Sequence, residues 1–273
     1  MIESALPPIP SSTVLLLRDS LEGLEVFMIK RNSGIDFAGG ALVYPGGKFD
    51  PADLTEETAA YCDGIEGLDM PDIGYRVCGI RETFEEAGFL LARATGDVAL
   101  VDGERCSIIG AEYREAVHAG EMSMKELARK EKLSLACDYL VPFAHWITPR
   151  NFPKRYDTWF FLAEAPDGQM GSHDNSESVD SLWINPDEAL GGGRSKAHNI
   201  VFATRMNLRK LGRSNTVDLA LTAARADIIV TVEPVISRLN GEVAFSIPLE
   251  AGYGIDKETE TDDGPTKVPL FEV

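Results

Sequence analysis

The pattern of hydrophobic positions predicts strands in several parts of the chain. Near the start, two apolar runs, 12–19 and 24–31, are separated only by a short polar turn, which predicts a β-hairpin. A shorter strand is expected at 41–44, just before a proline and two glycines that favour a turn. The remaining strands are expected later in the chain: 139–146, 158–163 and 181–184, with a closing hairpin at 228–248.

Helical periodicity alternates with these strands. The strongest helical segment covers about 73–91, and a charged segment at 108–132 predicts two helices broken near Gly120. Shorter helices are expected elsewhere: 53–62, 186–191, 198–211 and 216–226. Because helices interleave with strands throughout, the predicted class is mixed α/β, or α+β, with helices packed on a sheet.

The helix at 73–91 separates charge from apolar surface. At about 100° per residue, Glu82, Glu85 and Glu86 fall on one stripe. The apolar residues of the segment fall on the opposite stripe: Val77, Ile80, Phe84 and Ala87. The apolar side is therefore expected to be buried, and Gly88 to mark a helix break or a close approach.

Two interpretations of the three glutamates are open at this point. They could form the solvated face of a surface helix, or they could bind a divalent cation. Like charges at these spacings repel one another and weaken a helix, and Arg81 is the only cation nearby. A solvated face normally intersperses lysines among the acids, whereas hard divalent cations require converging carboxylates.

Composition and charge narrow the class of partner. The chain has 273 residues, is 44% hydrophobic and 26% charged, and carries a formal net charge of -18. These values are typical of a globular protein, and the acidic excess disfavours a nucleic-acid polymer as partner. A phosphate-bearing substrate would be repelled unless cations intervene, and divalent metals are the obvious ones. Solubility is the alternative explanation of the acidic excess.

Several features of the sequence argue against a membrane protein and against an oxidising compartment. No apolar run reaches the length of a membrane span, and the first residues, MIESALPPIPSST, lack the pattern of a secretory signal. The four cysteines, Cys62, Cys78, Cys106 and Cys137, form no C-x-x-C pair. We therefore expect no membrane partner, no zinc site, no disulfide framework, and a cytoplasmic location.

Two short motifs carry a specific resemblance. PGGKF, at 45–49, has two glycines that allow a backbone to approach a ligand, and RETFEEAGF, at 81–89, contains the three glutamates. Together they resemble the box of the Nudix hydrolases, in which a glycine precedes R-E-U-x-E-E-x-G-U, where U is bulky and apolar. The resemblance implies a Nudix-type α/β/α sandwich with a mixed sheet. It also implies hydrolysis of diphosphate bonds in compounds that link a nucleoside diphosphate to another moiety.

The first half of this box is interrupted. Arg81 follows Gly47 by 34 positions, about 20 more than in the usual box, so an insertion is expected at about 53–72. Counted forward from Gly47, the early glutamate of the box falls on Asp53. Counted back from Arg81, it falls beside Asp72. Either aspartate, or neither, could take this role.

Later segments narrow the resemblance to one branch of the family. HWITPRNFPKRYDTWFFLA, at 145–163, and ESVDSLWINPDEAL, at 177–190, are similar to segments of peroxisomal-type coenzyme A diphosphatases, whose box is also interrupted. This branch implies CoA or an acyl-CoA as substrate, split to 3′,5′-ADP and (acyl-)phosphopantetheine. ADP-ribose-like or dinucleotide substrates, and a Nudix-fold binding protein without catalysis, are the alternatives.

The resemblance also implies a domain organisation. A Nudix hydrolase domain is expected at 8–211, with a helical insertion at about 108–132. A C-terminal extension with a helix and a β-hairpin follows at 212–256, and the hairpin could serve a homodimer or cap the site. The last segment, 257–273, is acidic and is expected to be a mobile tail.

A metal site for Mg²⁺ or Mn²⁺ is implied by the same motifs. Its ligands would be Glu82, Glu85 and Glu86, together with the backbone carbonyl of Gly46 or Gly47. These ions would neutralise the phosphoryl oxygens and acidify an attacking water.

Two further catalytic roles follow from the family pattern. Arg81 is expected to orient the glutamates through charge-assisted hydrogen bonds, without touching substrate. A general base is also needed, and the candidates are Glu177 and Asp174 in the polar loop SHDNSES. A capping or solvent-facing acid is the alternative for both.

Substrate contacts are expected from cations. Arg150 and Arg155 belong to the densest basic cluster of the chain and could bind a phosphate group. Pairing with neighbouring acids is the alternative. Arg31 and Lys48 flank the expected site and are other phosphate partners.

Other residues receive a plainer interpretation. Phe37, Tyr44 and Trp146 could stack on an adenine, although core packing is the commoner fate of aromatic residues. Cys78 is expected to be a small buried residue under the site rather than a nucleophile. The four histidines show no metal-ligand spacing.

Overall fold

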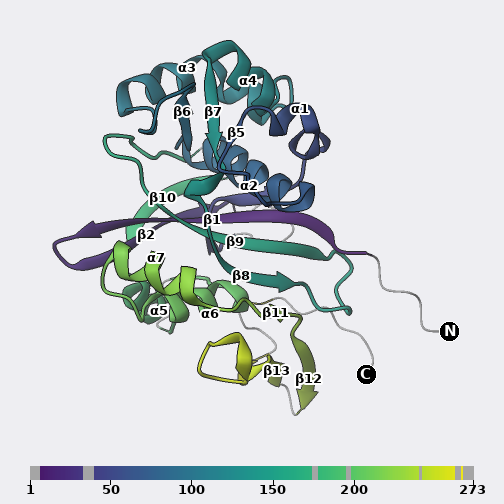
Figure 1. Cartoon of the computed structure of the whole chain (residues 1–273). Coiled ribbons are helices and arrows are strands. Elements are labelled where there is room, and N and C mark those ends of the chain that lie inside the picture. The colour runs from purple at the N-terminus through teal and green to yellow at the C-terminus, as the bar shows by residue number, and fades with distance from the viewer. Residues whose placement is uncertain are drawn as a thin grey trace.

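The structure of this chain is a computed structural model. It describes residues 7–32, 40–173, 178–194, 198–239, 242–261 and Thr266. Within them, helices cover both faces of a central mixed sheet (Figure 1). The predicted sandwich of helices around a mixed sheet is confirmed.

Strands in the described residues form one large sheet and two small ones. The large sheet contains β1 (Ile9–Ser20), β2 (Gly23–Arg31), β3 (Leu42–Val43), β4 (Gly46–Lys48), β8 (Val141–Ile147), β9 (Tyr156–Glu164), β10 (Ser178–Ile184) and β11 (Thr231–Val232). One small sheet contains β5 (Cys62–Asp63), β6 (Ala92–Ala94) and β7 (Leu133–Ala136). The other contains β12 (Val235–Leu239), β13 (Glu242–Ser246) and β14 (Lys257–Thr261).

Helices and single helical turns connect these strands. The helices are α1 (Glu56–Ala59), α2 (Met70–Glu82), α3 (Gly103–His118), α4 (Met124–Glu131), α5 (Pro186–Arg194), α6 (Phe202–Leu211) and α7 (Val217–Ala226). The single turns are η1 (Pro51–Leu54), the π-helical η2 (Thr83–Ala87), η3 (Cys137–Tyr139) and η4 (Leu249–Ala251).

The large sheet is built around β1. Its order is β10-β2-β1-β9-β8-β11, with β3 paired to β2 and β4 paired to β1. β1 and β2 are antiparallel, so the predicted hairpin is confirmed, whereas β1 and β9 are parallel. The β1–β4 pairing sets Gly46 and Gly47 opposite Thr13 and Ser12, which fixes the PGG motif beside the centre of the sheet.

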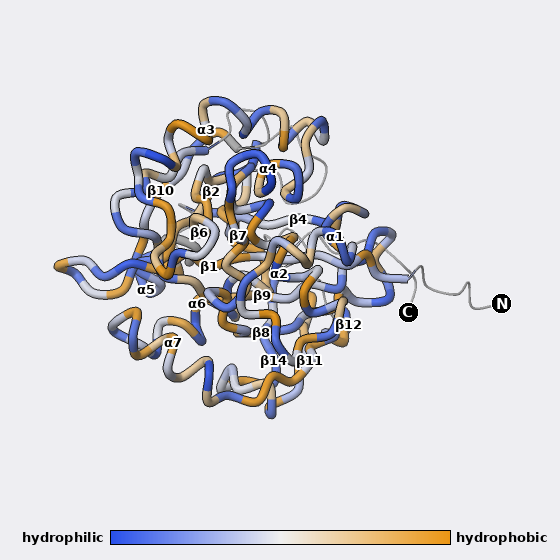
Figure 2. The backbone as a smooth tube through the Cα atoms, turned by 45° about the horizontal axis from the view of Figure 1, so that its top comes forward, coloured by the Kyte–Doolittle hydropathy of each residue, from blue (hydrophilic) through white to orange (hydrophobic). Residues whose placement is uncertain are grey.

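Alternation along β1 creates two cores. Leu15 and Leu17 pack with residues of α5, α6, α7 and the β12–β14 sheet, whereas Val14 and Leu16 pack with residues of α2, α3 and α4. Successive strand residues point to opposite faces, so one strand serves both layers. Figure 2 shows hydrophobic segments in the central strands and a largely hydrophilic α4 at the periphery. Each helical layer therefore buries one apolar stripe against the sheet.

α2 begins and ends earlier than the sequence pattern predicts. Asp69 caps its start by accepting a hydrogen bond from the N–H of Asp72 at 2.9 Å. Its continuation, η2, ends at Gly88, whose φ of 72° lies in the left-handed region that favours glycine. The predicted end at Leu91 is wrong because the apolar run after Gly88 leads into β6, not into another helical turn.

The two expected insertions pack onto the α2 layer. The segment at 53–72 contains the second half of η1, all of α1 and β5, and the start of α2. The prediction of two helices broken near Gly120 is confirmed by α3 and α4, although α3 begins earlier, after its Asp102 cap.

The predicted mobile tail at 257–273 is wrong for its first residues. β14 pairs with β13, and Arg205 of α6 forms ion pairs with Glu258 and Glu260 of β14. The acidic composition that predicted mobility instead supplies partners for basic residues of α6. Arg209 adds a further contact to Glu258 at 3.4 Å.

No helix in the described ranges combines the length and the apolar character needed to cross a bilayer.

Candidate active site

The three glutamates at the end of α2 and in η2 are buried. Their exposed fractions are 8% for Glu82, 7% for Glu85 and 4% for Glu86. A solvated helix face would leave such carboxylates in water, so the structure contradicts that alternative. A π-helical turn is rare and is frequently found at functional sites. Buried carboxylates require charged or hydrogen-bonding partners.

Arg81 supplies most of these partners. Its Nη1 donates to Oε1 of Glu82 at 2.8 Å and to Oε1 of Glu85 at 3.0 Å. Its Nε and Nη2 donate to the carboxylate of Asp53, with the shortest distance 2.9 Å, and Nη2 also donates to the carbonyl of Lys48 at 2.9 Å. Arg81 therefore fixes the orientation of two glutamates, as a hydrogen-bonded guanidinium can.

Asp53 is the aspartate that joins this network. It is 3% exposed, and the N–H of Asp50 donates to its Oδ2 at 2.9 Å. Asp72 instead lies in the first turn of α2 and is absent from the residues that line the adjacent cavity. The position counted forward from Gly47 is thus the one that meets Arg81.

The glycines of β4 lie against the glutamates. The N–H of Gly46 donates to Oε2 of Glu86 at 2.8 Å. A Cβ added to Gly47 would lie 2.6 Å from Oε1 of Glu82, so only glycine leaves room for that carboxylate. From the α2 side, the thiol of Cys78 donates to the carbonyl of Gly47 at 3.6 Å. Burial raises the pKa of Cys78, which fits the expected packing role rather than a nucleophile.

The carboxylates share more negative charge than Arg81 can neutralise. Burial raises the pKa of Glu82 to about 7, Arg81 opposes this rise, and the charges of Glu85 and Asp53 add to it. Burial also raises the pKa of Glu85 and of Asp53. One guanidinium faces three carboxylates, so a further cation would be stabilised here.

The oxygen ligands at this position suit Mg²⁺ or Mn²⁺ in kind. Such ions prefer carboxylate, carbonyl and water oxygens. The hydrogen bonds that Arg81 donates to Glu82 and to Glu85 each use Oε1, and the space kept open by Gly47 adjoins Glu82. These residues therefore fit a metal by the type of their ligand atoms. Over the described ranges, no three acidic, histidine or cysteine side chains are already gathered as a metal-binding group.

A cavity of about 940 Å³ opens beside the carboxylates, a size that suits a small-molecule site. Arg81 and the three glutamates belong to its lining, and we call this part its acidic end. Aromatic residues of several elements also line it: Trp146, Phe160, Phe202 and Phe245. The cavity thus combines buried carboxylates with aromatic surface.

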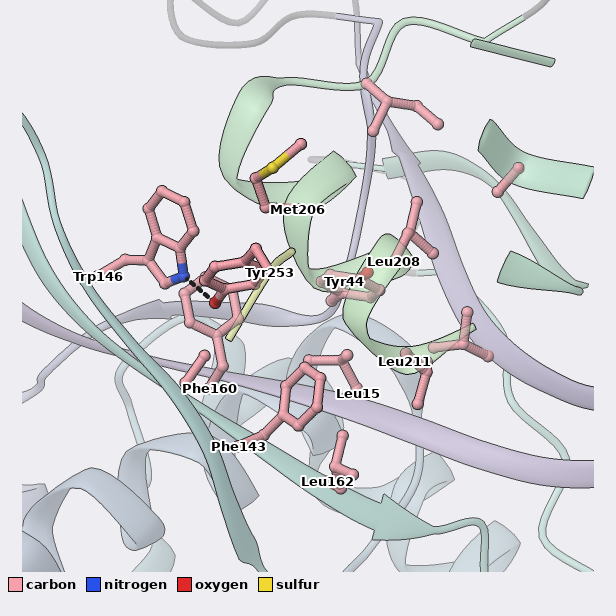
Figure 3. Packing of buried hydrophobic residues seen from close by; sticks show 14 of the residues in the cluster. Leu15, Tyr44, Phe143, Trp146, Phe160, Leu162, Met206, Leu208, Leu211 and Tyr253 are labelled. Carbon is pink, nitrogen blue, oxygen red and sulfur yellow. Dashed lines mark hydrogen bonds between the residues drawn. The ribbon is translucent and has the colours of Figure 1, made fainter. Parts of the chain in front are cut away.

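Two of these aromatic residues, Trp146 and Phe160, are also part of the hydrophobic core. Trp146 Nε1 donates to the hydroxyl of Tyr253 at 2.8 Å, and Phe160 packs in the same cluster (Figure 3). Tyr44 also lines the cavity, and its hydroxyl donates to the carbonyl of Thr204 at 3.4 Å. Two of the three aromatic residues proposed from the sequence therefore serve both the core and the cavity wall. The third, Phe37, lies outside the described residues.

Comparison with known proteins identifies the family. The model of the NUDT19 Nudix domain matches residues 63–204, slightly more than half of the chain. The chain belongs to this Nudix family. The resemblance inferred from PGGKF and RETFEEAGF is thereby confirmed.

Curated relatives and one solved structure agree with this assignment. Acyl-coenzyme A diphosphatase NUDT19 of Gallus gallus is 28% identical over 209 residues, covering 61% of this chain and 55% of the relative. The Homo sapiens protein of the same name is 25% identical over 213 residues, covering 64% and 57%. The chain therefore spans about half the length of the curated relatives it matches. A NUDIX hydrolase from Alicyclobacillus acidocaldarius has the same fold, with a TM-score of 0.62, 22% identity and coverage of 79% and 96%.

Cations around the Nudix site divide into two groups. Arg31 and Lys48 line the cavity, and the buried Nε of Arg31 has no hydrogen-bond partner in the described ranges. Arg150 and Arg155 do not line it, and both pair with Glu233, at 3.3 Å and 2.9 Å. The expectation that these two arginines bind substrate is not supported, because both pair with Glu233. This glutamate lies 83 residues after Arg150 and 78 residues after Arg155.

The two candidates for the general base, Asp174 and Glu177, lie outside the described residues. The residues on either side of that segment are anchored at the Nudix site. The N–H of Ser172 donates to the carbonyl of Ala87 at 2.9 Å, and Ser178 pairs in register with Arg31.

Arg114 and His118 of α3 contact Glu85, one of the Nudix glutamates, and were not predicted from the sequence. Arg114 Nε donates to the carbonyl of Glu85 at 2.8 Å, and His118 Nδ1 lies 3.8 Å from Oε2 of Glu85. The pair has no motif, and only its spacing of four residues hinted at a shared helix face. The contact is made by tertiary packing of α3, which no local pattern encodes.

Proposed function

We propose that this protein hydrolyses the diphosphate bond of CoA or an acyl-CoA, giving 3′,5′-ADP and (acyl-)phosphopantetheine. The observation that carries the proposal is a single cavity lined both by three buried Nudix glutamates and by several aromatic side chains. A nucleoside diphosphate attached to a long, partly apolar arm matches that combination of polar and apolar lining. The names of the curated relatives support the same substrate class.

Each polar group at the acidic end has a proposed task. Glu82, Glu85 and Glu86, with a backbone carbonyl of Gly46 or Gly47, hold Mg²⁺ or Mn²⁺. When bound, these ions neutralise phosphoryl oxygens and lower the pKa of a bound water. Arg81 keeps two of the glutamates oriented, and its own hydrogen bonds are taken up by protein groups.

Two cations that line the cavity are the proposed phosphate contacts. Arg31 and Lys48 line the cavity, and the Nε of Arg31, unpartnered among the described residues, is a donor suited to a phosphate oxygen. Lys154 lines the same cavity and is a further candidate. The repulsion expected from a net charge of -18 is thus reduced locally.

Glu177 is the proposed general base, with Asp174 second. Support comes from the described residues on both sides of their segment: Ser172 contacts the Nudix turn, and Ser178 pairs with Arg31. In this role Glu177 would accept a proton from the attacking water. Glu177→Gln is expected to lower kcat with little change in KM.

A substrate panel tests the proposed function. Wild-type protein is incubated with CoA, an acyl-CoA, ADP-ribose and a dinucleotide, with Mg²⁺ or Mn²⁺ and separately with EDTA, and products are separated by mass. We expect 3′,5′-ADP from CoA or acyl-CoA, and none in EDTA. Turnover of ADP-ribose alone would overturn the substrate, and no turnover of any compound would overturn the hydrolase.

A cytoplasmic location remains our proposal. All four cysteines are free, which is compatible with a reducing compartment. Fractionation of cells that express the chain, with the protein found in another compartment, would overturn it.

A further inference from the structure

α3 belongs to the inserted helical segment, outside the two sequence motifs of the Nudix box, yet it reaches one glutamate of the box from two directions. Arg114 and His118 lie one turn apart near the end of α3. Arg114 contacts the backbone carbonyl of Glu85, and His118 faces its carboxylate.

Arg114 secures the end of the helix that carries the glutamates. Its Nε donates to the carbonyl of Glu85 at 2.8 Å, and its two Nη atoms donate to Oγ and to the carbonyl of Ser172, at 3.0 Å and 2.7 Å. The N–H of Ser172 in turn donates to the carbonyl of Ala87 at 2.9 Å. The last carbonyls of a helix lack partners within it and carry partial negative charge. A guanidinium there satisfies one of them and offsets that charge.

His118 completes the surroundings of the Glu85 carboxylate. Arg81 donates to Oε1 at 3.0 Å, and His118 Nδ1 lies 3.8 Å from Oε2. His118 also lines the cavity, together with Gly120, Met122, Ser123 and Met124 that follow it. The wall next to Glu85 is therefore made by the inserted helices.

We infer that Arg114 and His118 are positioning residues for Glu85, so that the inserted helix α3 is a working part of the Nudix site. Arg114 fixes the backbone of the π-helical turn, and His118 limits the positions open to the carboxylate. Residues that orient metal ligands typically matter about 10- to 100-fold for metal affinity or activity. This inference rests on the proposed function, because it assigns a role within the same site.

The test compares two arginines of the same helix. Arg114→Ala removes the contact to Glu85, and Arg114→Lys keeps the charge but loses the forked geometry. Arg105→Ala is the matched control, because Arg105 of α3 donates to the carbonyl of Glu131 at 2.6 Å, at the end of α4 and away from the cavity. His118→Ala tests the second residue. All variants are assayed for thermal unfolding, for Mn²⁺ binding by electron paramagnetic resonance without substrate, and for kcat and KM.

We expect Arg114→Ala to weaken Mn²⁺ binding and to lower kcat by about 10- to 100-fold, with KM nearly unchanged. Arg114→Lys should fall between it and wild type, and His118→Ala should show a smaller loss of both. Arg105→Ala should lower the melting temperature without either effect. Equal Mn²⁺ affinity and kcat in the Arg114→Ala and Arg105→Ala proteins would overturn the inference. An inactive wild type whose Mn²⁺ affinity still depends on Arg114 would overturn the proposed reaction but not the positioning role.

Discussion

At the scale of single residues, buried charge is the main feature of this protein. Asp53, Glu82 and Glu85 surround the guanidinium of Arg81, and all four side chains are nearly fully buried. Removing carboxylates from water costs free energy that a single cation offsets only in part. Such an arrangement is expected where a site binds a cation, because stability and function often oppose each other there.

Glu82→Gln is expected to stabilise the metal-free protein at about pH 8. The pKa of Glu82 is about 7 in the fold against 4.5 ordinarily, so the folded state binds the proton more tightly than the unfolded chain. Its contribution to stability is therefore greatest below pH 4.5 and declines as the pH rises toward about 7. Thermal unfolding in EDTA should show a higher melting temperature for the variant than for wild type at about pH 8. This difference in melting temperature should disappear near pH 5. A difference independent of pH would contradict this account of the site.

Gly47→Ala is expected to disturb the site without unfolding the protein. The added Cβ would lie 2.6 Å from Oε1 of Glu82, so that the carboxylate must move. We expect metal affinity to fall by about tenfold or more, as when a ligand's support is lost. Gly110→Ala in α3 is the control, because its Cβ would meet nothing within 4 Å. Calorimetric titration with Mn²⁺ measures the metal affinity of both variants. Equal affinities of the Gly47→Ala and Gly110→Ala proteins would show that the space at Gly47 is not needed.

At the scale of elements, hydrophobic periodicity predicted the buried face of a helix. It was less reliable for the residue at which a helix ends. α2, α3 and α4 were predictable because each buries an apolar stripe in the same core. The end of η2 was missed because the apolar residues after Gly88 continue the pattern of a buried helix, although the backbone has already turned at a φ of 72°. Local hydrophobicity does not report such a turn.

The candidate site was predictable only where its residues lie in one motif. Arg81 and the three glutamates follow from RETFEEAG, and Gly47 from PGGKF, because sequence spacing fixes their places. The pairing of Arg150 and Arg155 could not be predicted, since their partner Glu233 lies 83 and 78 residues further along the chain. Asp53 and Asp72 could be separated only once the fold showed which of them meets Arg81.

β14 yields a prediction about the acidic segment after residue 256. Glu258→Gln together with Glu260→Gln should loosen this strand, because both carboxylates pair with Arg205. Hydrogen bonds to charged groups contribute roughly 1.5–3 kcal/mol when protected from water. Hydrogen exchange of the β14 amides should therefore become faster, whereas Glu242→Gln, an exposed residue of β13, should leave it unchanged. Unchanged exchange in the double variant would contradict a role for these ion pairs.

At the scale of the whole molecule, the cavity is shared by parts of different origin. β4, α2 and η2 supply its acidic end, α3 supplies His118, and β13 supplies Phe245. Residues of α7 and β13 pack in the same core as the central strands. Homodimerisation through the hairpin stays a prediction, which sedimentation can test.

The most direct test of the central claim is the turnover of CoA by wild-type protein and by Glu86→Gln. The glutamine amide keeps an oxygen that can accept from the N–H of Gly46, which is now 2.8 Å from Oε2 of Glu86, so the fold should persist while the charge is lost. With Mg²⁺ or Mn²⁺, wild type should release 3′,5′-ADP, and the variant should be slower by at least about 100-fold, more than for a supporting residue, at an unchanged melting temperature. A folded Glu86→Gln protein with wild-type turnover would contradict the account.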